Sequence, residues 1–224
     1  MTEPRTVLVV GAHPDDEVLG AGGTIAKHAN AGDEVHVLIV TEGASQQYDD
    51  ETLIDQKVTE TQQCAETLGV EAVHHGDLPD MRLDAVDHVE INSVIESVVE
   101  SVGPDVVYTH SPTDVNKDHQ HVYDSTLVAT RPNSGVQRVL SYEVPSSTNW
   151  TGAGQQFDPS VYVDITETLE RKLAGFAAYE SEHREYPHPR SAEAIEAYAK
   201  MRGTAAGYRA AEAFQLVSEY RGTI

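Results

Sequence analysis

The chain has 224 residues, of which 37 are acidic and 15 are lysine or arginine, so its formal net charge is −22. Such a charge repels phosphate backbones and anionic lipid headgroups, so we expect neither nucleic acid nor a membrane surface as a partner. The one cysteine, Cys64, excludes an intrachain disulfide and a cluster of thiolate metal ligands. Acids spread along the whole chain are typical of halophilic proteins, in which salt screens the repulsion.

The amino-terminal stretch, MTEPRTVLVV, has neither the basic segment nor the long apolar segment of a secretory signal. No stretch reaches the ~18 consecutive apolar residues of a membrane span. We therefore expect a cytoplasmic protein, with residues 1–224 forming one domain. The sequence leaves a monomer and a homo-oligomer equally open.

Short apolar runs alternate with helical patterns over the first two thirds of the chain. The predicted strands cover residues 6–10, 34–41, 71–74, 105–110 and 138–144. The predicted helices cover residues 19–31, 50–68, 86–102 and 119–130. This alternation predicts a mainly parallel sheet, of strand order 3-2-1-4-5, with helices on both faces. The fold class is therefore α/β, a Rossmann-like three-layer sandwich.

The last third of the chain has a different pattern. A loop over residues 146–156 precedes a short strand at 160–165, and two helices follow at 167–179 and 191–211. Because no linker divides this part from the rest, it predicts a C-terminal helical cap on the sheet and not a second domain.

Two acidic clusters follow predicted strands at the edge where parallel sheets bind ligands. The first is HPDDE, residues 13–17, after the first strand, and the second is THSPTDVNKDHQH, residues 109–121, after the fourth. A divalent cation would offset the carboxylate charge and also bind imidazole. His13, Asp16 and one histidine of the second cluster would give three ligands and an open water position, which is the pattern of catalytic zinc.

The chain resembles the LmbE/PIG-L family of zinc-dependent deacetylases, which act on N-acetylglucosamine-type substrates. The similar stretches are AHPDDE (12–17), DVNKDH (114–119) and the segment HPRSAEAIEAYAKMRGTAAGYRAAEAF (188–214). The resemblance implies Zn²⁺ held by His13, Asp16 and His119, with Asp15 as the general base that takes a proton from the attacking water. It also implies a small-molecule partner, an acetylated amino sugar or glycoconjugate.

The second motif departs from the family at one position. Many members have a histidine three residues before the last ligand, and this chain has Asn116 there. An amide donates a hydrogen bond but cannot move a proton, so the acid would be Asp15 or another histidine, such as His110 or His188. We expect Asp118 to orient a neighbouring side chain.

The candidates for substrate contact come from the HPRS stretch. Arg190 and His188 are the substrate-binding candidates, with Arg190 suited to a sugar hydroxyl or a carboxylate. The stretch has a second explanation, in which Ser191 simply caps the following helix.

Two other functions compete with a deacetylase. A metal-binding protein without catalysis is one, since Asn116 would weaken the acid step. A Rossmann-type nucleotide-binding protein is the other, suggested by Gly20, Gly22 and Gly23, although the acids before these glycines would repel a pyrophosphate. The sequence thus favours a zinc-dependent hydrolase of an N-acetyl linkage.

Overall fold

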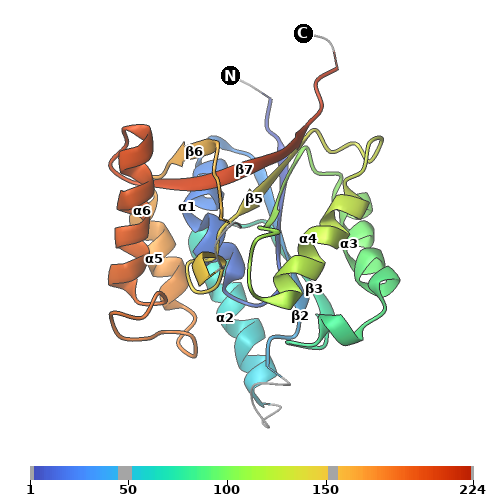
Figure 1. Ribbon diagram of the computed structural model, residues 1–224, viewed down its shortest axis with the longest axis horizontal. Helices are drawn as coiled ribbons and strands as arrows, with labels where there is room; N and C mark the ends of the chain where they lie inside the picture. Colours follow the sequence, from blue (N-terminus) through green and yellow to red (C-terminus); the bar gives the residue numbers. More distant parts are fainter. Residues whose placement is uncertain (1–2, 45–51, 151–155, 223–224) are drawn as a thin grey trace.

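The computed structural model describes residues 3–44, 52–150 and 156–222, and these form one mixed sheet covered by helices (Figure 1). The strand order is β3-β2-β1-β4-β5-β7-β6, and the first five of these strands are parallel. The strands, in chain order, are β1 Thr6–Gly11, β2 Glu34–Thr41, β3 Ala72–Leu78, β4 Val106–His110, β5 Arg138–Tyr142, β6 Val161–Asp164 and β7 Ala211–Glu219. The predicted order 3-2-1-4-5 is confirmed, and the order reverses between β1 and β4.

Helices cover both faces of the sheet, which confirms the three-layer sandwich (Figure 1). One face carries α1 Asp16–Ala31, α2 Thr52–Leu68, α5 Leu169–Ala177 and α6 Ala192–Ala206, and the other carries α3 His88–Val102 and α4 Lys117–Ala129. Alternate residues of β1 enter the two cores: Val7 and Val9 pack on the α1 side, and Leu8 and Val10 on the α3 side. Because β1 is buried on both faces, its sequence is an uninterrupted run of apolar residues.

The C-terminal part of the chain supplies more than the expected helical cap. Helices α5 and α6 do form that cap, but the predicted helix 191–211 ends at Ala206, before Gly207 in the left-handed region at φ 78°. The chain then returns to the sheet as β7, antiparallel to both β5 and β6. The sequence analysis missed β7 because its alanine-rich beginning has high helix propensity, which pairing with two strands overrides.

Other boundaries moved by a few residues. Strand β3 runs on to Leu78, where the prediction stopped at residue 74, and α1 begins at Asp16 instead of residue 19. The first two residues of the predicted helix 50–68 and residues 151–155 of the predicted loop lie outside the described part of the chain. Within the described part, no helix is long and apolar enough to cross a membrane.

The three glycines of α1 have a packing role. A Cβ atom at Gly20 would lie 2.2 Å from the ring of Tyr142 on β5, and one at Gly23 would lie 2.8 Å from Ile165. The glycines thus let α1 approach the sheet and the chain before α5. This explanation removes the structural support for a nucleotide-binding glycine loop.

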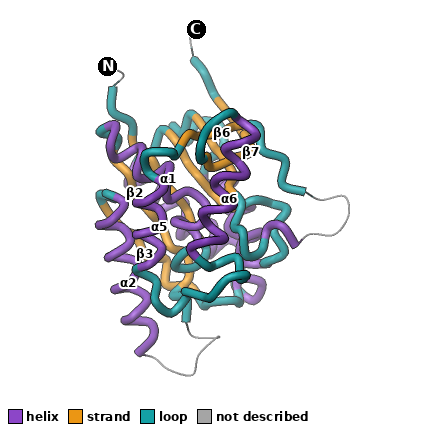
Figure 2. The backbone as a smooth tube through the Cα atoms, turned by 90° about the vertical axis from the view of Figure 1, so that its left-hand side faces the viewer, coloured by secondary structure: helices purple, strands orange, loops and turns teal. Residues whose placement is uncertain are grey.

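The middle of α1 is also held by the C-terminal part of the chain, because β7 lies next to this helix (Figure 1 and Figure 2). The carboxylate of Glu212 on β7 accepts hydrogen bonds from the N–H groups of Gly23, at 2.9 Å, and Thr24, at 2.7 Å. Lys172 of α5 pairs with Glu212 at 2.6 Å and donates to the carbonyl of Leu19. Because Lys172 and Glu212 are both buried, the pair fixes α1 relative to β7.

Candidate metal centre

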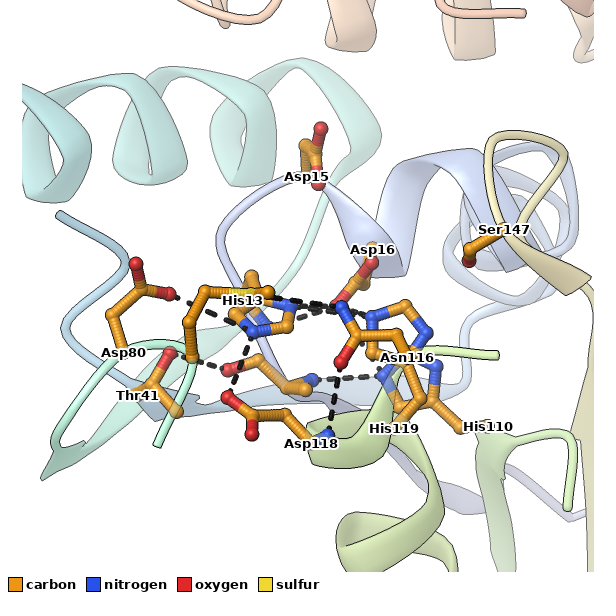
Figure 3. Close-up of polar contacts among 12 residues, drawn as sticks. His13, Asp15, Asp16, Thr41, Asp80, His110, Asn116, Asp118, His119 and Ser147 are labelled. Atoms are coloured by element: carbon orange, nitrogen blue, oxygen red, sulfur yellow. Dashed lines mark hydrogen bonds and ion pairs between the residues drawn. The ribbon is translucent and has the colours of Figure 1, made fainter. Parts of the chain in front are cut away.

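The first acidic cluster lies in the turn between β1 and α1. Asp15 is the residue just before the helix and has φ 106°, a conformation that non-glycine residues rarely adopt. The carbonyl of His13 accepts a hydrogen bond from the N–H of Asp16, which closes the turn. The turn directs Asp16 and His13 towards the neighbouring strand β4, and it leaves Asp15 apart from both of them (Figure 3).

Three potential ligand atoms form a nearly equilateral triangle (Figure 3). Nδ1 of His13 lies 3.2 Å from Oδ2 of Asp16 and 3.2 Å from Nε2 of His119, and the last two atoms are 3.3 Å apart. Bonds of ~2.0–2.1 Å in a tetrahedral zinc site give ligand separations of ~3.3 Å. The three atoms therefore have the spacing of a bound divalent ion, and the two sequence motifs supply them jointly.

A carboxylate contacts the outer nitrogen of each histidine in the triangle. Oδ2 of Asp118 lies 3.2 Å from Nε2 of His13, and Oδ2 of Asp114 lies 3.1 Å from Nδ1 of His119. Asp114 also accepts hydrogen bonds from the hydroxyls of Ser147 and Thr148. A carboxylate on the outer nitrogen of a histidine fixes its ring and leaves the inner nitrogen free for a metal ion.

The centre holds more buried negative charge than its own side chains offset. Its buried carboxylates are Asp15, Asp16, Asp80, Asp114 and Asp118. Oδ1 of Asp16 and both oxygens of Asp80 accept no hydrogen bond from the described residues. Unsatisfied buried carboxylates are costly, and a cation relieves that cost. The donor set and the unmatched charge together fit a divalent ion at the triangle.

Without a metal ion, protons on the histidines neutralise part of this negative charge. Burial by itself would lower the pKa of His13, but hydrogen bonds to Asp118 and Asp16 raise it to about 10. Burial opposes the same change at His119, where the negative charge of Asp16 raises the pKa to about 9. Burial alone would raise the pKa of Asp16, but His119 and His110 lower it well below its usual value. The centre therefore attracts positive charge.

Asp15 lies beside the triangle but contacts none of its three ligand atoms in Figure 3. Burial raises the pKa of its carboxyl well above the usual value, and the positive charge of Arg190 opposes this. Nη1 of Arg190 is 3.3 Å from Oδ2 of Asp15. A carboxyl with a raised pKa next to an arginine suits proton transfer.

Arg190 is itself held by a chain of buried charges. Nη1 of Arg190 pairs with Glu182, whose other oxygen pairs with Lys57 of α2. Lys57 is 2% exposed and also donates to the hydroxyl of Ser181. Alternating charges thus run from α2 to Asp15, so Arg190 has one defined position.

The other predicted residues have different surroundings. His110 stacks on His119 with ring centres 3.9 Å apart, and its Nε2 accepts the N–H of Ala12. Burial lowers the pKa of His110 to about 4, so the ring is neutral. Asn116 is the N-cap of α4, since its side-chain oxygen accepts the N–H of Asp118, and its amide nitrogen points to the sulfur of Met81.

The structure does not bring His188 or His121 to the triangle. His188 is exposed, and its Nδ1 accepts the backbone N–H of Arg190. The ring of His121 lies next to that of His88, 6.4 Å between centres. Ser191 caps α6 by accepting the N–H of Ala194, so the HPRS stretch both caps a helix and places Arg190 at the centre.

The sequence analysis missed four residues at or near the centre: Asp80, Asp114, Glu182 and Lys57. Asp114 lies in the quoted second motif, and its place four residues after a strand's carboxyl end was a usable signal. Asp80 follows β3 at the same edge, but the prediction ended that strand too early. Glu182 and Lys57 have no motif around them, because only the packing of α2 against the segment after α5 brings them to Arg190.

Comparison with known proteins identifies relatives of this fold and centre. The family model described as "PIG-L: GlcNAc-PI de-N-acetylase" matches residues 8–130. The diacetylchitobiose deacetylase of Thermococcus kodakarensis is 28% identical over 95% of this chain and 83% of its own. The sequence motifs and this family match therefore agree.

Two solved structures show the same fold. The N,N'-diacetylchitobiose deacetylase of Pyrococcus horikoshii has a TM-score of 0.78 at 22% identity, covering 96% of this chain and 84% of its own. GalB of Pseudomonas putida, a 4-carboxy-2-hydroxymuconate hydratase, has a TM-score of 0.76 at 22% identity, covering 98% and 99%. Since these two proteins catalyse different reactions, the fold alone does not determine the reaction.

Proposed function

We propose, from the premise that this chain belongs to the PIG-L family, that it is a zinc-dependent hydrolase that removes an N-acetyl group from an N-acetylglucosamine-type substrate. The observation that supports this proposal most directly is the ligand triangle of His13, Asp16 and His119. The carboxylate of Asp15, which is not one of the three ligands, lies beside it. The name of the family and of the Thermococcus relative support the substrate class. The His/Asp donor set supports zinc, because three mixed ligands with an open position are typical of catalytic zinc.

The roles of the residues follow from their positions. When bound, the ion supplies a water of lowered pKa and polarises the amide carbonyl. Asp15 removes the proton of the attacking water, since its carboxylate lies beside the triangle in Figure 3 and pairs with Arg190 and not with a histidine. Asp114 and Asp118 keep the rings of His119 and His13 in the ligating orientation.

Asp15 also returns the proton to the departing amine. Asn116 is occupied as a helix cap and the His110 ring is neutral, so neither replaces the histidine found at position 116 in many family members. The balance between burial, which favours protonated Asp15, and Arg190, which favours ionised Asp15, suits a group that first takes and then gives a proton.

Arg190 holds Asp15 and faces the substrate. Its Nη1 is shared between Asp15 and Glu182, and its Nε donates to the hydroxyl of Ser146. The Nη2 group has no partner among the described residues and can donate to a hydroxyl or carboxylate of the substrate. We therefore assign Arg190 both a positioning and a substrate-binding role.

The test is acetate release from a panel of N-acetylated sugars, including N-acetylglucosamine and diacetylchitobiose, by metal-loaded protein in strong salt. We expect release from at least one sugar, and loss of release after chelation with recovery on adding Zn²⁺. Asp84→Asn is the matched control, because Asp84 is an exposed aspartate away from the triangle. A panel without any turnover, in protein that binds stoichiometric metal, would contradict the proposal.

That last outcome would favour the second function, a metal-binding protein without catalysis. The observation behind this alternative is Asn116, which cannot move a proton and is used to cap α4. Restoring the histidine separates the two functions. An Asn116→His variant that gains acetate release from an inactive parent would show that the acid step had been lost.

A further inference from the structure

A pocket with both polar and apolar lining lies at the opposite edge of the sheet from the metal centre, near the amino-terminal ends of the parallel strands. Its volume is about 250 Å³, and Arg5, Thr24, Lys27, His28, Ala31, Asp33, Val106, Tyr108, Arg138 and Val163 line it. Thr24, Lys27, His28 and Ala31 form one stripe along α1, at helical spacing. The stripe faces the starts of β4 and β5, and no residue of the metal centre takes part.

The pocket gathers positive charge in a chain that has little of it. Arg5, Lys27 and Arg138 are three of only 15 lysine and arginine residues in a molecule of net charge −22. The pKa of His28 responds to the charges around it: burial lowers it most, the hydrogen bond and the negative charge of Asp33 raise it, and the positive charges of Arg5 and Lys27 lower it. The lining thus holds three cationic side chains against the single carboxylate of Asp33, and this excess of positive charge favours an anion.

Two buried hydrogen-bonding groups of the pocket have no partner among the described residues. The hydroxyl of Thr24, a residue 2% exposed, is buried without a hydrogen bond, and so is Nε of Arg138. The carboxylate nearest to that Nε is Glu219, at 3.8 Å, which is too far for a hydrogen bond. Unsatisfied buried donors are costly, so a ligand that accepts from both would remove that cost.

The one acidic residue that lines the pocket is already engaged. Oδ2 of Asp33 lies 2.6 Å from Nδ1 of His28, and its Oδ1 accepts the N–H of Arg5 at 2.9 Å. The other ring nitrogen of His28 lies 3.0 Å from the hydroxyl of Tyr108. Asp33 therefore fixes His28 and Tyr108 as one wall and leaves the two guanidinium groups for a ligand.

We propose that this pocket binds a small organic carboxylate. Arg138 and Arg5 would hold the carboxylate by their guanidinium groups, and Thr24 would donate its hydroxyl to the same group. The side chains of Val106, Val163 and Ala31 would contact the apolar body of the ligand. The cavity volume suits a molecule of the size of a single aromatic ring with its acid group.

The test uses benzoate as the probe and benzamide, which has the same shape without the charge, as its control. In ¹⁵N-labelled metal-loaded protein at fixed salt, we expect benzoate to shift the Nε–H resonance of Arg138, with a dissociation constant of ~1 mM or tighter. Benzamide should leave this resonance in place. Because the resonance reports on Arg138, benzoate bound at the metal centre does not imitate the result.

Variants then locate the contacts by calorimetry. Arg138→Gln should weaken benzoate binding by ~10–100-fold and Thr24→Val, which keeps the volume, by ~2–10-fold. Arg131→Gln is the matched control, because Arg131 is an exposed arginine paired with Glu96 on the other face of the sheet. A stationary Arg138 resonance, an equal shift with benzamide, or wild-type affinity in Thr24→Val would each overturn the proposal.

Discussion

The two edges of the sheet collect opposite charges. The carboxyl-terminal edge gathers five buried aspartates around three histidines, and the amino-terminal edge gathers Arg5, Lys27 and Arg138 around one pocket. Helix α1 contributes to both, with acids at its first turn and Lys27 and His28 near its last. Each set of charges complements the helix dipole at its end.

The edges also differ in how the chain builds them. The metal centre draws its ligands from two short motifs, each directly after a strand, so the sequence displays it. The cationic pocket draws its lining from five separate segments of the chain, so no motif marks it. The difference teaches that local motifs reveal sites built at strand ends, whereas sites assembled from dispersed residues need the tertiary structure.

The largest expected effect is at Asp15, and it tests whether the acidic edge is catalytic. Asp15→Asn should lower kcat by ~10²–10⁴-fold, because an amide cannot take the proton of the attacking water. Bound zinc, measured by elemental analysis, should stay near that of the unchanged protein, since Asp15 is not a ligand. Activity within a few fold of the parent would remove Asp15 from the mechanism.

The pH dependence of metal binding tests whether the histidines of the metal centre exchange bound protons for a cation. At pH 7 the metal-free protein holds protons on His13 and His119, whose pKa values are raised to about 10 and about 9. Metal binding must release these protons, so affinity should rise by up to ~100-fold per pH unit below pH 9 and level off above pH 10. Calorimetry in buffers of different ionisation enthalpy should count the protons released, about two per ion, and a count of zero would contradict this account.

Substitution of a carboxylate that orients a ligating histidine should have a smaller effect, and the effect should be on zinc affinity. Asp114→Asn should weaken zinc binding by ~10–100-fold, because His119 loses the carboxylate that holds its ring. Competition with a chromophoric chelator measures the affinity. Asp124→Asn is the control, because Asp124 lies on helix α4 with His119. An unchanged zinc affinity in Asp114→Asn would mean that helix α4 alone orients the ring of His119.

The close packing of α1 can be tested away from both edges. Gly20→Ala should destabilise the fold by about 1–3 kcal/mol, because the added Cβ would meet the ring of Tyr142, whose hydroxyl is bonded to the carbonyl of Val10. Urea unfolding measures the change. Gly222→Ala, where a Cβ meets nothing within 4 Å, should be neutral; equal stability of the two variants would show that α1 can shift.

The smallest effect concerns net charge. Raising KCl from about 0.1 M to about 1 M shortens the screening length from ~10 Å to ~3 Å and weakens repulsion among the 37 acids. A gain of about 1 kcal/mol would raise Tm by roughly 2–4 °C in a chain of this size. A Tm that falls with KCl would contradict the halophilic interpretation.

The sequence predicted the parallel part of the sheet well, because strands buried on both faces are continuous apolar runs. It placed His13 and Asp16 close to a histidine of the second cluster, since parallel strands end at one edge and the order reverses between β1 and β4, and the family resemblance identified that histidine as His119. It missed β7, where helix propensity is high and only pairing with β5 and β6 makes a strand.

The parts of the centre that the sequence left open depend on tertiary contacts. Whether Asn116 faces the substrate or caps a helix is decided by where α4 begins, at Lys117. Arg190 reaches Asp15 because Glu182, which is itself paired with Lys57, holds its guanidinium, and neither residue lies in a recognisable sequence pattern. Side chains that act through a neighbour are invisible until that neighbour is placed.

The bond between Glu212 and the backbone of α1 joins the beginning of the chain to its end. During synthesis the turn with His13 and Asp16 leaves the ribosome early, but the last strand, which anchors its helix, emerges after nearly 200 further residues have been added. A nascent or truncated chain that stops before β7 would therefore contain all three metal ligands, but its helix α1 would lack the contacts with Glu212. Metal capture should therefore follow the synthesis of β7.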